Sequence, residues 1–342
     1  MKKVRVEDAI GMALGHDLTE IRAEKGLKHR AFRRGHIVRP EDVERLKDLG
    51  KFTVHVAGPD DTDVHEDDAA LEVAPLVAGP GIVHDPEPSE GKIMFRADQD
   101  GLFRVDARRL LAINLLGIPA LPTIPDCFPV RKGDKVAAFR IVPLTCSREI
   151  IDQVIAQLPT PLCEIKPYLV HTAAVLVTGS EVYEGRIEDG FVPRLKETLE
   201  PYQVTVTRHD IYPDDRALIA RAVREAVAAT DIVFVTGGTS VDPDDVTVAA
   251  LRDAGLQDEL KGMPLQPGNN FTVGYIGGTA VCAVPAATLF HRATALDLLL
   301  PRLLAGLRLT RHDVAAMGHG GLGLPGTDDC FPNSTFGRGG PA

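Results

Sequence analysis

The sequence lacks an excess of basic residues, a long uninterrupted apolar run and a segment that could act as an export signal. Its 38 lysines and arginines against 48 aspartates and glutamates give a net charge of −10, so a nucleic-acid duplex or an anionic membrane is a poor partner. The most apolar stretch, residues 296–307, contains charges and is shorter than a bilayer requires. Charges at positions 2–8 occupy the place where a signal peptide needs apolar residues. We therefore expect a soluble, cytoplasmic protein.

Cysteines that could form a disulfide framework are also lacking. The five cysteines are odd in number, widely spaced and without a C-x-x-C pair, which favours reduced thiols. His312, His319 and Cys330 near the end of the chain could ligate a metal, although such scattered side chains are more often incidental.

Changes in composition divide the 342 residues into parts, as expected for a chain longer than one ordinary core. An acidic stretch rich in proline and glycine separates two apolar regions, and regular alternation of strands and helices begins only in the second half. The predicted parts are a small α+β accessory module at 1–57, an acidic linker or excursion at 58–91, a β-rich accessory module at 92–160, an α/β domain at 166–307 and a glycine-rich tail at 308–342.

Local patterns give more detail for the accessory modules. The first reads as a βαβ-like unit, because Val43, Leu46 and Leu49 share one helical face and Gly50 then ends the helix before an alternating strand. In the second, Lys132-Gly133-Asp134 predicts a hairpin turn. The tail after Met317 shows no apolar periodicity, so we expect a loop that folding does not require.

Three consecutive strand-then-helix units dominate the second half. Such units imply right-handed crossovers, and hence a parallel sheet with helices on both faces, a three-layer α/β fold. The predicted strands are 173–177, 203–207 and 231–235, the helices are 192–199, 216–229 and 246–254, and a hairpin at 271–284 precedes a long closing helix at 287–307.

Two glycine-rich loops follow strands of this predicted sheet. The first strand leads into Thr178-Gly179-Ser180-Glu181 and the third into Thr236-Gly237-Gly238-Thr239-Ser240. Glycines there let backbone N–H groups approach an anion, and the next helix adds the positive end of its dipole. Either loop alone would be typical of an ordinary turn, but two at one sheet edge favour a phosphate site.

Carboxylates gather at the same predicted edge, in Tyr212-Pro213-Asp214-Asp215 and Asp242-Pro243-Asp244-Asp245. Several carboxylates would repel a phosphate unless a divalent cation lay between them, which indicates Mg²⁺. The alternative is that Asp215 and Asp245 cap the helices they precede.

Together these segments, with Asp189-Gly190, resemble the molybdopterin-binding domain shared by molybdopterin molybdotransferases and molybdopterin adenylyltransferases, over about residues 170–305. The upstream modules resemble the accessory modules of molybdotransferases. The resemblance implies molybdopterin or molybdenum cofactor as ligand and a Mg²⁺-dependent step with catalytic Asp214 and Asp245. It further implies pterin contacts at Thr178, Gly179, Ser180, Glu181, Asp189, Thr236, Gly237, Gly238, Thr239, Ser240, Pro267 and Gly268, and metal contacts at Asp214, Asp242 and Asp245.

The sequence also departs from the molybdotransferase pattern. That group usually offers a lysine and a Leu-Pro-Gly-Asn-Pro turn, whereas this chain reads Asn269-Asn270-Phe271 and later Val284-Pro285-Ala286-Ala287-Thr288. Two function classes stay open: an enzyme that inserts molybdenum or transfers a nucleotide, and a carrier or sensor of the cofactor. A more distant alternative is a nucleotide-processing relative of the same fold. For both function classes we expect a homo-oligomer, dimer or trimer. Molybdate, a molybdoenzyme and another cofactor biosynthesis protein are the further expected partners.

Overall fold

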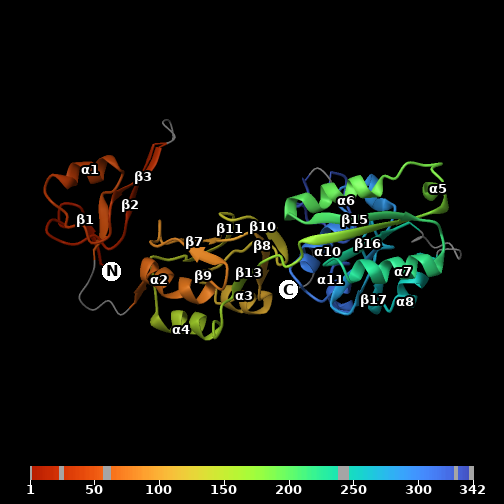
Figure 1. Ribbon diagram of the computed structural model, residues 1–342. Coiled ribbons are helices and arrows are strands. Elements are labelled where there is room, and N and C mark those ends of the chain that lie inside the picture. Colours follow the sequence, from red (N-terminus) through yellow and green to blue (C-terminus); the bar gives the residue numbers. More distant parts are fainter. Residues whose placement is uncertain (1, 23–26, 57–62, 238–245, 327–329, 339–342) are drawn as a thin grey trace.

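The computed structural model describes residues 2–22, 27–56, 63–237, 246–326 and 330–338. Three bodies follow one another in chain order, with the amino-terminal module at one end and the α/β domain at the other (Figure 1). No helix in the described part is long and apolar enough to cross a membrane.

The amino-terminal module pairs its strands antiparallel, which corrects the βαβ-like prediction. Strand β1 (Lys2–Arg5) lies antiparallel to β4 (Thr53–Val56), and β2 (Leu18–Arg22) to β3 (Leu27–Phe32). Helix α1 (Asp42–Asp48) is present as predicted and buries Val43 and Leu46. Only a crossover of a dozen or more residues yields parallel strands, and the apolar pattern does not reveal strand direction.

The structure also corrects the predicted linker at 58–91. Helix α2 (Glu66–Val77) lies within this segment and buries an apolar face of Ala69, Ala70, Val73 and Ala74 in the core of the second module. Acidic residues occupy the first turn of α2, where they complement the helix dipole. The acidic composition therefore marks the start of a helix.

The second module contains short antiparallel strands with three helices. The predicted turn at Lys132-Gly133-Asp134 exists, since Asp134 N–H donates to the Arg131 carbonyl at 3.0 Å, but its two flanking strands pair in different sheets. The remaining elements are β5 (Val64–His65), β6 (Ile82–His84), β7 (Ile93–Ala97), β8 (Gly101–Val105), α3 (Ala107–Asn114), β9 (Pro119–Ala120), β10 (Phe128–Val130), β11 (Lys135–Ile141), β12 (Thr145–Cys146), α4 (Arg148–Ala156) and β13 (Cys163–Lys166).

Two histidines lie where the first two modules meet, of which His65 is buried and His16 half-buried. His16 stacks at a tilt on His55, with 5.6 Å between ring centroids, and His65 caps α2 by accepting the Asp67 N–H at 3.1 Å. His16 Nδ1 and His65 Nε2 are buried without a partner in the described part of the chain. Burial lowers the pKa of both rings. We call His16 and His65 the histidine pair.

The α/β domain has a six-stranded sheet in the order β15-β14-β16-β19-β18-β17. The first four of these strands run parallel and the last two antiparallel to their neighbours. Every predicted strand is present. The strands of the sheet are β14 (Thr172–Thr178), β15 (Thr205–Tyr212), β16 (Ile232–Thr236), β18 (Thr272–Ile276) and β19 (Thr279–Val284), together with β17 (Gln257–Lys261), which was not predicted.

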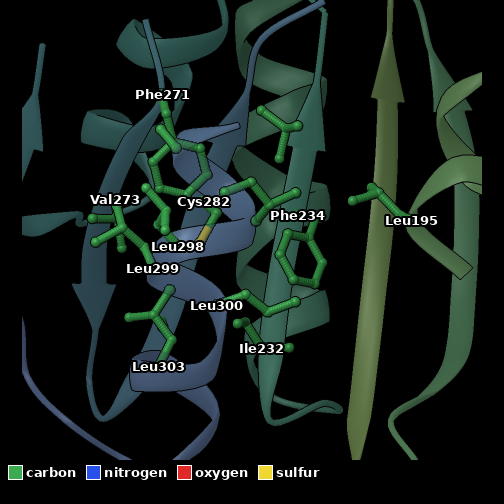
Figure 2. Close-up of a cluster of buried hydrophobic side chains, with 14 of the residues drawn as sticks. Leu195, Ile232, Phe234, Phe271, Val273, Cys282, Leu298, Leu299, Leu300 and Leu303 are labelled. Atoms are coloured by element: carbon green, nitrogen blue, oxygen red, sulfur yellow. The ribbon is translucent and has the colours of Figure 1, made fainter. Parts of the chain in front are cut away.

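Helices cover both faces of this sheet, so the three-layer prediction is confirmed. On one face α6 (Phe191–Leu199) and α10 (Ala295–Leu304) pack against the sheet, and on the other α7 (Arg216–Val227) and α8 (Thr247–Asp253) do so. Figure 2 shows Leu300 of α10 beside Phe234 of β16, and the other labelled α10 leucines on the side of Val273 and Cys282. Short elements complete the domain: α5 (Ser180–Tyr183), η2 (Glu200–Tyr202), α9 (Ala287–Phe290) and α11 (Arg311–Ala316).

The closing helix differs from the prediction for 287–307, because the chain leaves helical geometry between α9 and α10. Helix α10 begins anew with a capping box, in which the Thr294 hydroxyl and backbone N–H both donate to Asp297 Oδ2 at 2.8 and 2.9 Å. A capping box satisfies the first backbone donors of a helix. The spacing Thr-x-x-Asp was the signal that could have revealed this break.

The tail belongs to the core of the α/β domain, which corrects its prediction as dispensable. Met317 and Phe336 are 4% and 2% exposed and pack in the cluster that includes the sheet. Val314 of α11 is fully buried in the same cluster. Ending the chain near Asp313 would remove all three side chains. Single aromatic anchors between glycines have no periodicity, which is why the sequence pattern missed them.

Candidate functional site

The parallel strands end together at one edge of the sheet. In register, Thr178 of β14 lies beside Tyr212 of β15, and Thr236 of β16 lies beside Val284 of β19. We call these four strand ends, the loops that follow them and the segment that precedes β18 the carboxyl edge. Open α/β sheets bind ligands at such an edge.

The first glycine loop is tied to the Asp214 loop at this edge. Gly179 has φ of 143° and its N–H donates to the Tyr212 carbonyl at 3.2 Å. Ser180 donates to Asp214 Oδ2 twice, from its N–H at 2.9 Å and its hydroxyl at 3.1 Å. In return, the Asp214 N–H reaches the Ser180 hydroxyl oxygen at 3.2 Å. The structure thus joins two predicted site residues that are 34 positions apart.

A threonine network fixes the start of the second glycine loop. The buried Thr178 hydroxyl donates to the Thr236 carbonyl at 2.8 Å and lies 3.1 Å from the Thr247 hydroxyl. Thr247 in turn donates to the Gly237 carbonyl at 3.0 Å. Sequence reasoning missed Thr247. A threonine directly after the loop, at the start of α8, was the available signal.

Gly237 is required by the fold before any ligand is considered. Its φ is 82°, and a Cβ atom there would lie 2.0 Å from the Thr178 carbonyl oxygen. Only glycine accommodates both the positive φ and this approach of two backbones. The rest of the loop lies outside the described residues, and so do the predicted site residues Gly238, Thr239, Ser240, Asp242 and Asp245.

Thr236 carries a buried hydroxyl that has no partner in the described part of the chain. The residue is 0% exposed and ends β16 directly before Gly237. A buried hydroxyl without a hydrogen bond costs on the order of 1–3 kcal/mol. Within the described residues, the sheet therefore has a hydroxyl without a hydrogen bond at the edge where a phosphate is expected.

Two of the predicted carboxylates act as helix caps. Asp215 Oδ1 accepts the N–H groups of Ala217 and Leu218, both at 2.9 Å, at the start of α7. Asp189 accepts the N–H groups that open α6, at 2.8 and 3.0 Å. Both oxygens of Asp189 are engaged in this way, so a contact from Asp189 to the pterin stays a prediction. Glu181 turns back over the loop, since its Oε1 lies 2.9 Å from the place of a Gly179 Cβ.

Pro267 and Gly268 connect the carboxyl edge with α10. They precede β18, whose first residue Thr272 pairs with Ala283 near the end of β19. The Pro267 carbonyl accepts the Ala295 N–H at 3.2 Å. A Cβ on Gly268, where φ is 103°, would lie 2.8 Å from that same nitrogen. These two residues therefore hold the amino end of α10 at the carboxyl edge.

The carboxylates described at this edge could bind Mg²⁺ only together with the phosphate of a bound molecule. Within the described residues, no group of three His, Cys, Asp or Glu side chains could hold a metal. Mg²⁺ commonly takes one or two carboxylates together with substrate phosphates. Asp214 offers one such carboxylate, because its Oδ1 has no hydrogen bond in the described part of the chain while Oδ2 binds Ser180.

Several known proteins and protein families have sequences similar to parts of this chain. Residues 174–305 match a family described as "Probable molybdopterin binding domain", and residues 3–58 match a "Domain of unknown function (DUF8806)". A molybdopterin molybdenumtransferase of Haemophilus influenzae is 29% identical over 147 residues, 41% of this chain and 36% of that protein. A CinA-like protein of Desulfosudis oleivorans is 40% identical over 82 residues, 24% of this chain and 20% of that protein.

Among solved structures, the molybdopterin biosynthesis enzyme MoaB of Thermus thermophilus is 21% identical, with a TM-score of 0.34. It covers 39% of this chain, and 91% of its own length is matched. The similarity to the probable molybdopterin binding domain thus lies within the α/β domain.

Proposed function

We propose that this chain binds molybdopterin at the carboxyl edge and supports the Mg²⁺-dependent insertion of molybdenum into it. The observation that carries the proposal is the cradle made by Ser180 and Asp214. A hydroxyl, a backbone N–H and a carboxylate from two loops are fixed on each other there, beside the two glycine loops.

In this proposal the glycine loops hold the terminal phosphate of the pterin with their backbone N–H groups, while Ser180 holds Asp214 in place. A charge-assisted hydrogen bond contributes about 1.5–3 kcal/mol, so three donors could supply most of the roughly 8 kcal/mol of a micromolar complex. The hydrogen bonds from Ser180 fix the orientation of Asp214, and Asp214 Oδ1 would then bind the metal. Mg²⁺, when bound, neutralises phosphate charge and acts as a Lewis acid. Asp242 and Asp245 are the further proposed ligands, and Asp245 the second proposed catalytic residue.

A carrier or sensor of the cofactor is the second candidate function, and one observation favours it. Asn269 and Asn270 stand where molybdotransferases usually offer a lysine, and Ala286 caps α9 without a side-chain hydrogen bond. A protein that only holds the cofactor needs the phosphate cradle but not that basic group.

Two measurements test the proposal on the purified full chain. Mass spectrometry of co-purifying small molecules identifies the pterin, and titration with molybdopterin measures its affinity. Incubation with adenylylated molybdopterin, molybdate and Mg²⁺ then measures whether the chain converts these substrates. Binding with turnover is expected. Binding without turnover would leave the carrier, and the absence of binding would refute both functions.

The proposal includes a cellular setting. Cofactor synthesis places the chain in the cytoplasm, as a homo-oligomer that delivers its product to a molybdoenzyme or to another biosynthesis protein. Sedimentation velocity of the purified chain tests the oligomeric state, for which a dimer or trimer is expected.

A further inference from the structure

A cavity of about 900 Å³ lies between the β-rich module and the α/β domain. Its walls come from the segment around β10, from α6 and α10, and from the tail. Small-molecule sites commonly measure roughly 300–1,000 Å³. None of the residues that line it belongs to the glycine loops or to the Asp214 loop. The cavity is therefore separate from the proposed molybdopterin site.

Charged side chains in the wall are unevenly paired. Each carboxylate in the wall already has a partner, since Asp297 accepts from Thr294, Glu197 lies 3.8 Å from Arg194, and Asp100 and Asp134 accept backbone N–H groups. Four cations of the wall have no carboxylate partner in the described part of the chain, namely Arg131, Lys135, Arg292 and Arg338. With Arg194 included, the wall holds five cations and four carboxylates, so its formal charges nearly balance and leave a surplus of one positive charge.

Arg338 is the most confined of these cations. Its guanidinium lies over the Phe128 ring, 4.3 Å from the centroid, and donates to the carbonyls of Pro332 and Ser334. Burial, followed by the charge of nearby Arg302, lowers the pKa of Arg338 to about 10. An anion in the cavity would relieve both costs, because it would give this cation a counter-charge.

Polar and aromatic groups complete the lining. The Ser334 hydroxyl is buried without a partner among the described residues, and Ser334 lines the cavity. Tyr168 and Tyr202 meet edge to face, with ring centroids 5.3 Å apart, and Phe128 adds a third ring. Flat apolar surfaces beside a cation are suited to a planar ring that carries a negative group.

We propose that this cavity binds a small organic anion of mononucleotide size, with a planar ring against the aromatic side chains and its anionic group at Arg338 and Ser334. AMP is the probe for this class, because it combines a planar ring with a phosphate. Adenosine carries the ring alone and inorganic phosphate the charge alone. Isothermal titration of the full chain should show one AMP per chain, and at least about tenfold weaker binding of either half.

The variant R338Q keeps a polar side chain that can donate hydrogen bonds and removes the charge. It should weaken AMP binding at least about tenfold, the loss expected for one charge-assisted contact. The matched control is R308Q, because Arg308 also stacks on an aromatic ring, Tyr275 at 4.4 Å, but lies outside the cavity. Its affinity should stay within about twofold of wild type. If R338Q does not fold, S334A should still weaken AMP binding several-fold, since the lost hydroxyl leaves no partner behind.

Three outcomes would overturn the proposal. One is no AMP binding at millimolar concentration, and another is equal affinity in R338Q, S334A and R308Q. The third is a loss of affinity in D214N instead of R338Q, because AMP would then bind at the carboxyl edge. Molybdopterin affinity that is unchanged in R338Q would show that the two sites can be tested independently.

Discussion

Replacement of Asp214 by asparagine separates a role in chemistry from a role in structure. The asparagine oxygen can still accept the N–H and hydroxyl of Ser180, now 2.9 and 3.1 Å from Asp214 Oδ2. What is lost is the negative charge. Because the side chain is exposed, the free energy of unfolding should fall by at most about 1 kcal/mol.

The effect on turnover should be much larger. If Asp214 positions Mg²⁺, loss of its charge should reduce molybdenum insertion by about 100-fold or more, which equals about 2.7 kcal/mol in the barrier. Molybdopterin affinity should stay near the wild-type value, since removal of a carboxylate does not weaken an anion's binding. The assay follows turnover of adenylylated molybdopterin with molybdate and Mg²⁺, next to a titration with molybdopterin.

The chain offers a matched control at the opposite edge of the sheet. Asp231 Oδ2 accepts the N–H groups of His171 and Thr172 and the Thr172 hydroxyl, at 2.8 to 2.9 Å. Asp231→Asn should therefore cost similar stability and leave turnover intact. Wild-type turnover in the Asp214 variant would remove Asp214 from the mechanism. Equal losses in both variants would show a general effect on folding.

Three further predictions concern stability. Both rings of the histidine pair have a pKa below the value near 6.5 of an unfolded chain, so the unfolded chain binds more protons. The free energy of unfolding should therefore fall as the pH drops below about 6.5, by up to about 1.4 kcal/mol per pH unit for each ring. Thermal denaturation from pH 7.5 to 5.5 should show a smaller loss of stability in His16→Leu than in wild type, and equal losses would contradict the assignment. Gly237→Ala should destabilise the fold by about 2–5 kcal/mol, because the positive φ and the Thr178 backbone both exclude a Cβ. Gly255 has φ of 100° and open space around it, so Gly255→Ala should cost only about 1–2 kcal/mol. Urea unfolding of the two variants measures this difference in stability. Phe336→Ala should lower the free energy of unfolding by about 3–5 kcal/mol. Phe290 is 78% exposed, so Phe290→Ala should lower it by at most about 0.5 kcal/mol. A Phe336 variant as stable as wild type would show that folding does not require the tail.

The α/β sheet could be predicted because its signal is local. Buried strands such as Ile232–Thr236 and amphipathic helices such as α7 differ in period, and a parallel sheet follows from their alternation. The break between α9 and α10 was missed for a local reason too, since Thr294 and Asp297 were counted as interior helix residues instead of a cap. In both cases the information lies within a few residues.

The features that escaped prediction depend on contacts distant in sequence. Phe336 packs against the core from a glycine-rich tail, and Thr247 joins the ends of two strands through hydroxyls. Neither residue belongs to a periodic apolar pattern that would have predicted its contact. At the site, the loops that converge were predictable from strand order, whereas the bond between Ser180 and Asp214 required coordinates. The roles of Asp242 and Asp245, which lie outside the described residues, stay predictions.

The two outer strands of the sheet carry features that discourage aggregation. On β15, Arg208 binds Asp210 at 2.7 Å and Glu225 at 3.4 Å, so ionic groups occupy that margin. On β17 the pairing register shifts between Gln257 and Leu260, which marks an irregular margin. Charges and irregularities on edge strands prevent sheets of separate molecules from joining. Copies of this chain should therefore associate through helices or loops rather than by extending the sheet. Fibril growth by strand pairing at β15 or β17 is not expected even at high protein concentration.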